Sequence, residues 1–157
     1  MTKLIALLVS LLLTFFPDSA FLECKAQELA FPGTDKVCEM IAKYIKKNDV
    51  DSIYDLFCEA DKLDHENLKE QIQDIIEIVD GKTVKIERKL GVGHQSDYAN
   101  MGVYQSKRDF ALQIDTIDGS YELLIFWITV DTELPENVGL GSLALFDSEI
   151  NLVAEAY

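Results

Sequence analysis

The spacing of apolar residues changes once along the chain, and this change constrains the fold more than any other feature. Up to Gly81 the apolar residues recur at intervals of three and four positions, which places them on one face of a helix. Beyond Gly81 they alternate with polar residues, as in a strand with one wet face. Helices followed by strands, without repeats or a second core, predict a single α+β domain over residues 35–157.

The helical part of the sequence predicts three helices joined by short connections. The first runs from Asp35 to Lys47 after an N-cap at Thr34, and the second covers Val50–Ala60. In the third, Asp64 is the N-cap, and Gly81 closes the helix in the left-handed conformation that glycine favours. The connection between the first two helices is short, so we expect them to pack antiparallel.

Short alternating segments predict the first strands of the sheet. Val84 and Ile86 alternate with charged residues, and the apolar residues of Phe110–Ile114 alternate with smaller or more polar ones. Between these strands lies Gly91–Gly102, which is rich in Gly, Asn, Asp and His and shows neither period. This stretch is interpreted as a long loop or an irregular edge strand.

The most apolar segment, Tyr121–Val130, predicts the central strand of the sheet. It follows Asp118-Gly119, a residue pair that tight hairpin turns favour. Because neither face of this segment is polar, we expect it to lie in the middle of a covered sheet. Two further strands are expected at Leu140–Phe146 and Ile150–Ala154, which would complete the sheet.

The N-terminus has the layout of a secretory leader. Lys3 precedes the apolar run Leu4–Phe16, which is shorter than the about 20 helical residues that span a bilayer. We assign residues 1–26 to a signal peptide or lipoprotein leader and residues 27–34 to a short linker. The protein is therefore expected to be exported, and to be secreted, membrane-anchored or held at the cell surface.

The end of the leader has more than one interpretation. Cleavage after Ala26 places small residues at the two recognised positions, and Ala20 offers a second site. Alternatively, Cys24 follows the apolar run closely enough to be the lipid-accepting first residue of a bacterial lipoprotein.

Acidic residues outnumber basic ones two to one. The 28 Asp and Glu against 14 Lys and Arg give a formal net charge of −14, and the leader leaves this charge unchanged. A polyanionic surface repels phosphate backbones and anionic headgroups. We therefore expect no nucleic-acid partner, and membrane contact only through the leader or a lipid on Cys24.

The predicted order of elements resembles a known fold. Three helices, the first two forming a hairpin, and then a bent antiparallel sheet resemble the nuclear-transport-factor-2-like fold, in which the sheet curls around the long helix into a cone. The segment Asp35–Cys58 and the helix end Val79-Asp80-Gly81 are similar to those of a family of small exported bacterial proteins of unknown function. The resemblance covers residues 35–150. It implies a cone-shaped fold, a lipid on Cys24 and the option of homodimers through the open sheet face.

Two cysteines occupy related positions on the first two predicted helices. Cys38 and Cys58 lie equally far from Asn48, where the antiparallel pair turns, so their side chains should be neighbours. In an exported protein this arrangement predicts a disulfide. The alternative is two buried thiols that pack as small apolar side chains.

Acid–base residues offer a weak basis for catalysis. The cone-shaped fold, where it is enzymatic, uses Asp, His and Tyr, and here His94 has Asp97 and Tyr98 close in sequence, as a general base beside an orienting carboxylate would. Asp109, at the start of an alternating strand, is a second candidate base. The alternative is that these residues are merely solvated. No His-x-His, HExxH or CxxC spacing occurs, so we expect neither a metal site nor a cofactor.

Two hypotheses of function follow. The first is a non-catalytic extracytoplasmic binding module that holds an unknown small ligand or protein segment on the concave sheet face, lined by Tyr104, Phe110, Tyr121 and Trp127. The second is a small hydrolase or isomerase on the same cone, with His94 or Asp109 as base. If Trp127 and its neighbours fill the interior instead, a structural or interaction role on the outer surface remains.

Overall fold

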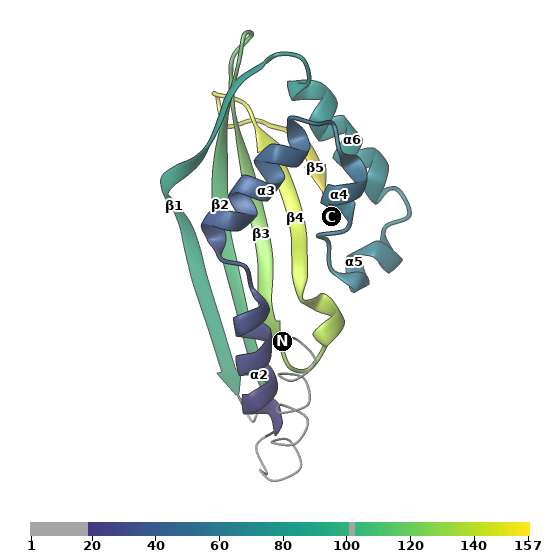
Figure 1. The fold of residues 1–157 in the computed structure, drawn as a ribbon, viewed down its shortest axis with the longest axis vertical. Coiled ribbons are helices and arrows are strands. Elements are labelled where there is room, and N and C mark those ends of the chain that lie inside the picture. The colour runs from purple at the N-terminus through teal and green to yellow at the C-terminus, as the bar shows by residue number, and fades with distance from the viewer. Residues whose placement is uncertain (1–18, 101–102) are drawn as a thin grey trace.

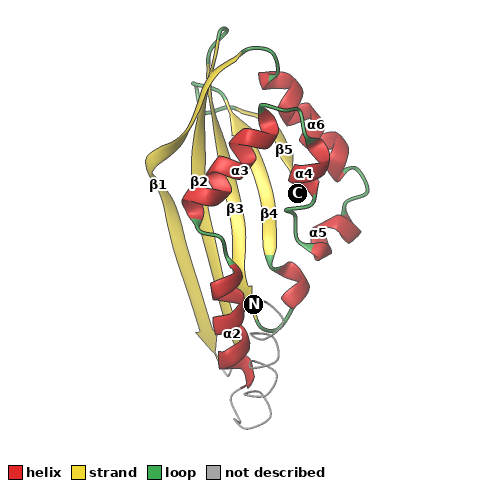
Figure 2. Cartoon of the chain, viewed as in Figure 1, coloured by secondary structure: helices red, strands yellow, loops and turns green. Residues whose placement is uncertain are grey.

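Five antiparallel strands form one sheet, and the helices pack on one of its faces (Figures 1 and 2). The structure, a computed structural model, describes residues 19–100 and 103–157. The strands lie side by side in sequence order: β1 (Thr83–Asn100), β2 (Val103–Thr116), β3 (Ser120–Asp131), β4 (Gly139–Phe146) and β5 (Leu152–Ala156). The helices are α2 (Ser19–Ala30), α3 (Thr34–Ile45), α4 (Val50–Tyr54), α5 (Glu59–Asp64), α6 (Leu68–Val79) and the 3-10 helix η1 (Pro135–Asn137). The α+β class is confirmed, although η1 lies between strands rather than before the sheet.

The predicted second helix is divided into α4 and α5 by a backbone contact with the sheet. The Cys58 amide donates to the Leu140 carbonyl at 2.9 Å, and the Leu140 amide donates to the Leu56 carbonyl at the same distance. Phe57 thereby forms a parallel bridge to β4 and is buried. A helix cannot continue through residues whose backbone groups bond to a strand, so one continuous helix over Val50–Ala60 was a wrong prediction.

Helix α6 is the long helix that the sequence predicts, but it begins later. Its buried residues repeat at helical spacing: Leu68, Ile72, Ile75, Ile76 and Val79. Asn67 is the N-cap, whereas Asp64 ends α5, so the prediction that Asp64 caps this helix was wrong. Gly81 follows the C-cap with a φ of 65°, which confirms its predicted role at the helix end.

The stretch rich in glycine is an edge strand with an irregularity. Residues 91–100 of the candidate loop belong to β1, which pairs with β2 with two register shifts, one between Thr83 and Lys85 and a larger one between Arg88 and Gly93. Gly91 and Gly93 have φ values of 82° and 148°, a backbone conformation that glycine adopts without strain. The structure thus agrees with the interpretation of an irregular edge strand rather than that of a long loop.

Strand β3 is central, as predicted, but helices cover only one of its faces. Leu123 and Ile125 are buried with the helices, whereas the alternate residues Leu124, Phe126 and Ile128 lie on the other face and are partly exposed. The prediction that both faces are covered was wrong. Apolar composition alone does not say whether the chain has enough helices for two layers.

The segment predicted as a linker begins inside helix α2. Gln27 donates from Nε2 to the Asp131 carbonyl at 3.1 Å, and its Oε1 accepts from the Asp131 amide at 2.9 Å. Beyond the helix, the Phe31 ring packs against Trp127 with a centroid distance of 5.8 Å. These contacts fix residues 27–31 to the end of β3.

Candidate functional site

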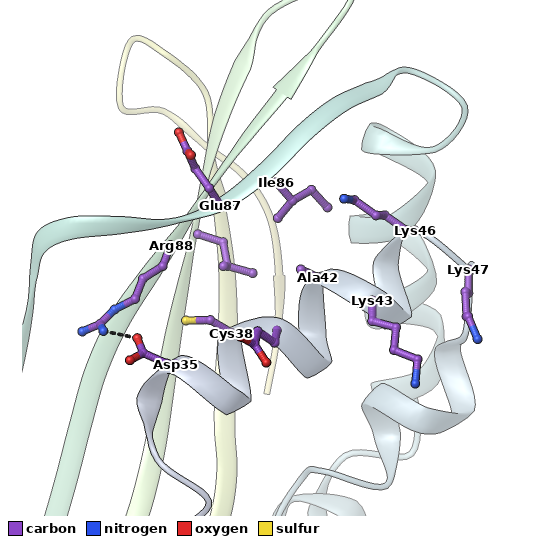
Figure 3. A pocket seen from close by; sticks show the side chains of 11 residues that line it. Asp35, Cys38, Ala42, Lys43, Lys46, Lys47, Ile86, Glu87 and Arg88 are labelled. Atoms are coloured by element: carbon purple, nitrogen blue, oxygen red, sulfur yellow. Dashed lines mark hydrogen bonds and ion pairs between the residues drawn. The ribbon is translucent and has the colours of Figure 1, made fainter.

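A cleft lies between helix α3 and the first two strands, and Figure 3 shows its walls. We call it the α3–β1 cleft; its volume is about 600 Å³. Its floor is apolar and consists of Cys38 and Ala42 from α3, Ile86 from β1 and Leu112 from β2. Helical spacing places Cys38 and Ala42 one turn apart on the same face of α3, which explains why both face the sheet.

Lysines gather at one end of the α3–β1 cleft. Lys43, Lys46 and Lys47 stand at the C-terminal end of α3, where positive charge complements the helix dipole. Figure 3 shows Lys46 reaching toward Ile86. All three side chains are exposed, and within the described part of the chain none of them forms an ion pair.

An ion pair closes the other end of the cleft. Asp35, in the first turn of α3, pairs with Arg88 of β1 (Figure 3). The remaining charged residues of the lining are Glu39 and Glu87, and Glu87 pairs with Lys85 at 2.8 Å. The lining therefore holds four cationic and three acidic side chains in a protein whose net charge is −14.

The thiol in the floor of the cleft is held in its neutral form. Cys38 is buried, and this burial raises the pKa of its thiol to about 11, although the positive charge of Arg88 acts in the opposite direction. At neutral pH the side chain is a neutral thiol and serves the cleft as an apolar surface.

The two cysteines that were expected to pair, Cys38 and Cys58, are buried free thiols in different parts of the structure. Cys58 lies beside β4 and donates from Sγ to Oδ2 of Asp61 at 3.0 Å, while Cys38 faces the α3–β1 cleft. The bridge between Phe57 and Leu140 draws Cys58 to β4, away from the antiparallel position that the disulfide required. The predicted disulfide is therefore not formed, and the structure agrees with the alternative of two buried thiols.

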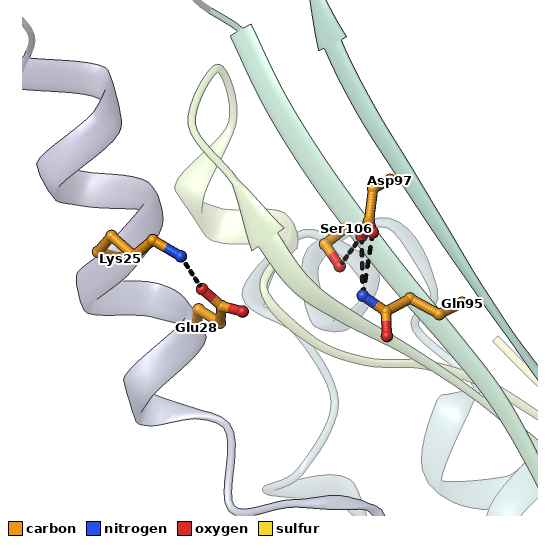
Figure 4. A network of polar contacts seen from close by, with 5 residues as sticks. All are labelled: Lys25, Glu28, Gln95, Asp97 and Ser106. Carbon is orange, nitrogen blue, oxygen red and sulfur yellow. Dashed lines mark hydrogen bonds and ion pairs between the residues drawn. The ribbon is translucent and has the colours of Figure 1, made fainter.

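The structure brings two of the candidate acid–base residues, His94 and Asp109, to one cavity and turns Asp97 away from them. His94 lies opposite Asp109 in the β1–β2 register, both are exposed, and no hydrogen bond joins them among the described residues. Asp97, three positions along the same strand, instead accepts from Ser106 at 2.7 Å and from Gln95 (Figure 4). These hydrogen bonds lower the pKa of Asp97. Residues three apart in a strand point to opposite faces, so His94 and Asp97 cannot form the predicted pair.

The aromatic candidates for ligand contact divide into two groups. Phe110 and Trp127 face the helices and are 1% and 7% exposed, so they belong chiefly to the core. Tyr121 is partly buried against that core. Tyr104 lies near the start of β2, where it is the cross-strand partner of Ala99. The helices pack on the sheet face that these residues were expected to line.

Trp127 also lines a smaller cavity of about 310 Å³, beside Phe31 and Gln27. Cys24, the candidate for lipid attachment, lies on α2 and is partly exposed.

Among the described residues no group of His, Cys, Asp and Glu could hold a metal ion. No helix in the same part of the chain is long and apolar enough to cross a membrane.

Sequence reasoning missed the residues that line the cleft. The lysines follow the pattern Lys43, Lys46, Lys47, which places them together on one side of a helix. This spacing could have indicated a local cationic site, and only the large negative total charge concealed it. Arg88 carried no recognisable signal, because its position beside α3 depends on how the sheet packs.

An antiparallel sheet with helices on one face, and a cleft between α3 and the first two strands, define a small α+β domain. The chain belongs to the family described as a domain of unknown function, DUF5104, which matches residues 40–148. The matched segment begins inside α3 and ends just after β4. No curated protein matches the chain.

Proposed function

We propose that the protein is a non-enzymatic binding module whose α3–β1 cleft holds a small amphipathic molecule with a negatively charged group. One observation carries this proposal: the cleft combines an apolar floor with three lysines that form no ion pair with any described residue, in a protein whose net charge is −14. An apolar part of a ligand would cover Ala42 and Ile86, which are partly exposed, and an anionic group would interact with the lysines.

Charge and shape both limit the ligand class. The surrounding −14 charge repels anions at long range, but it is screened beyond about 10 Å at moderate salt, whereas the lysines act at contact distance. A purely polar anion would gain nothing from the apolar floor, and a neutral apolar molecule would leave the lysines without a partner. An aromatic or aliphatic acid satisfies both requirements.

We also propose a fold group and a cellular compartment for the protein. We assign the fold to the nuclear-transport-factor-2-like group and residues 1–26 to an export leader; the element order and the charge-free N-terminal run support these assignments. Intact-mass measurement on protein from the membrane fraction tests the leader. A lipid on Cys24 is expected if the protein is a lipoprotein, and an unmodified N-terminus beyond Cys24 would contradict lipidation.

Titration with 1-anilinonaphthalene-8-sulfonate, an aromatic anion that fluoresces in apolar sites, tests the cleft. The triple variant K43Q/K46Q/K47Q should bind the probe about fivefold more weakly, a difference of about 1 kcal/mol. The matched control is K69Q/K82Q/K107Q, which changes the net charge equally; these lysines lie outside the cleft lining, as do Asp51 and Asp118, the ion-pair partners of Lys69 and Lys82. An equal loss in both triple variants would show that total charge, rather than the cleft, governs binding.

A second variant tests the apolar floor. Ala42→Phe places a ring in the cleft from a partly buried position of α3 and should abolish probe binding, while lowering helix propensity by only about 0.5 kcal/mol. The unfolding temperature serves as the control for folding. Unchanged probe binding in the folded variant would contradict the proposed function.

A further inference from the structure

The chain contains two arginines, Arg88 and Arg108, and both line a second cavity. This arginine cavity has a volume of about 320 Å³ and lies between the start of α3 and the glycine-rich irregularity of β1. Arg88 lines both the arginine cavity and the α3–β1 cleft, so the two hollows are neighbours.

Arg108 has an unsatisfied hydrogen-bonding group. Its Nε atom is buried and has no hydrogen-bond partner among the described residues, and its guanidinium group forms no ion pair there. The guanidinium carbon lies 5.3 Å from the centre of the Phe31 ring, so stacking holds the group in place. A buried donor without an acceptor destabilises the protein until an acceptor is supplied.

The nearest carboxylates do not supply that acceptor. Asp97 lies close enough for Arg108 to affect its charge, but its oxygens accept from Ser106 and Gln95 (Figure 4). Asp109 also lines the arginine cavity and is exposed. Its neighbour Phe110, which is buried, contributes the apolar part of the wall.

Arg88 can exchange its partner. Its ion pair with Asp35 is formed by side chains that are 36% and 78% exposed, and exposed pairs of this kind contribute little to stability. Thr34, the first residue of α3, also lines the cavity, and its helix has no side-chain cap. The free amide groups of the first turn therefore add to the positive potential.

We propose that the arginine cavity binds a phosphate group, either as inorganic phosphate or as a phosphomonoester. A phosphate has enough oxygens to accept from both guanidinium groups at once, and such charge-assisted hydrogen bonds are the strong ones. On binding, the phosphate displaces Asp35 from Arg88 and gives Arg108 its missing acceptor. This site goes beyond the proposed function, because it does not depend on the lysines or the apolar floor of the α3–β1 cleft.

Isothermal titration with sodium phosphate, against sodium chloride of equal ionic strength, tests the proposal on the wild-type chain. We expect saturable binding that chloride does not reproduce. Arg108→Met keeps the aliphatic stem over Phe31 and should weaken phosphate binding about tenfold or more. Asp35→Asn releases Arg88 and should strengthen binding by about threefold, a gain that simple damage to the fold would not produce.

Lys107→Met provides the matched control. It removes one positive charge from the adjacent position of β2, but Lys107 lies over Phe126 on the other face of the sheet. This variant should bind phosphate like the wild type. An equal loss in Lys107→Met and Arg108→Met, or no saturable binding in the wild type, would overturn the proposal.

Thermal unfolding in phosphate-free buffer separates binding from folding. Arg108→Met should unfold at the wild-type temperature or higher, because it removes the unsatisfied donor. Phenyl phosphate in place of inorganic phosphate then identifies the source: tighter binding points to an ester, and equal binding to the free ion. Because neither probe requires the lysines, this test and that of the proposed function can fail separately.

Discussion

The two faces of the sheet carry similar apolar side chains but have different surroundings. On the inner face, Leu123 and Ile125 are buried with α3 and α6 in the core. On the outer face lie long charged side chains: Lys107 lies over the Phe126 ring, and Lys89 pairs with Glu122 at 2.5 Å. The comparison teaches that burial in this protein depends on the helices and not on how apolar a strand is.

Adjacent leucines on β3 give the largest test of this comparison. Leu123→Ala on the inner face should lower the free energy of unfolding by about 3 kcal/mol, because it leaves a cavity in the core. Leu124→Ala on the outer face should cost less than about 1 kcal/mol, since the site is already partly exposed. Urea denaturation measures both. Equal losses would mean that the outer face is covered in solution, as it would be in a homodimer formed through the open sheet face.

Two glycines of β4 extend the test to the backbone. An alanine at Gly139 would place its Cβ 3.0 Å from the Cys58 nitrogen, and the φ of 146° is unfavourable for a side chain. Gly139→Ala should cost about 2 kcal/mol. Gly141→Ala would meet Phe126 at 2.8 Å, but that ring lies on the outer face and can move, so the cost should be about 1 kcal/mol or less. Thermal unfolding of the two variants checks the order, and a reversed order would show that the outer face is the more rigid one.

The smallest expected effect is the pH dependence of stability that comes from the two buried thiols on the helix-covered side of the sheet. Burial raises the pKa of both Cys38 and Cys58 from 9.0 to about 11. Below pH 9 the thiols are neutral in both states, so their contribution is fully present; above it only the unfolded thiols ionise. Stability should therefore fall between pH 9 and pH 11, by roughly 1 kcal/mol per thiol at pH 10.

Urea denaturation of the wild type and of the double variant C38A/C58A at pH 8 and pH 10 isolates this contribution. The variant is less stable at both pH values, but it should lose less on going to pH 10. Alkylation at pH 8 should reach the partly exposed Cys24 before the two buried thiols. An identical pH response of the two proteins would contradict the assigned burial.

The sequence predicts the elements of this fold better than their boundaries. The stripe on α6, the end of that helix at Gly81 and the central position of β3 all follow from local spacing and turn chemistry. The division between α4 and α5 does not, because Phe57 bridges to Leu140, a residue far along the chain. A contact across such a distance leaves no periodicity in either segment.

The candidate sites were less predictable than the fold. His94 and Asp97 are close in sequence, but strand geometry turns them to opposite faces, and this became visible only when Gly91–Gly102 proved to be mostly strand. The α3–β1 cleft requires a helix and a strand that are separated by the whole of α4 to α6. Local sequence therefore indicates which side chains are available, and the packing of α3 on β1 decides which of them meet.

The two hydrogen bonds between Gln27 and the backbone of Asp131 have a mechanical consequence. Asp131 ends the central strand, so a force applied to the N-terminal helix passes directly into the middle of the sheet. The side chain of Asp131 is held in turn by Gln105 and Asn137, at 3.1 Å each. A tether attached ahead of Gln27 would thus load β3 along its length, where many backbone hydrogen bonds resist shear together, rather than peel away an edge strand one bond at a time.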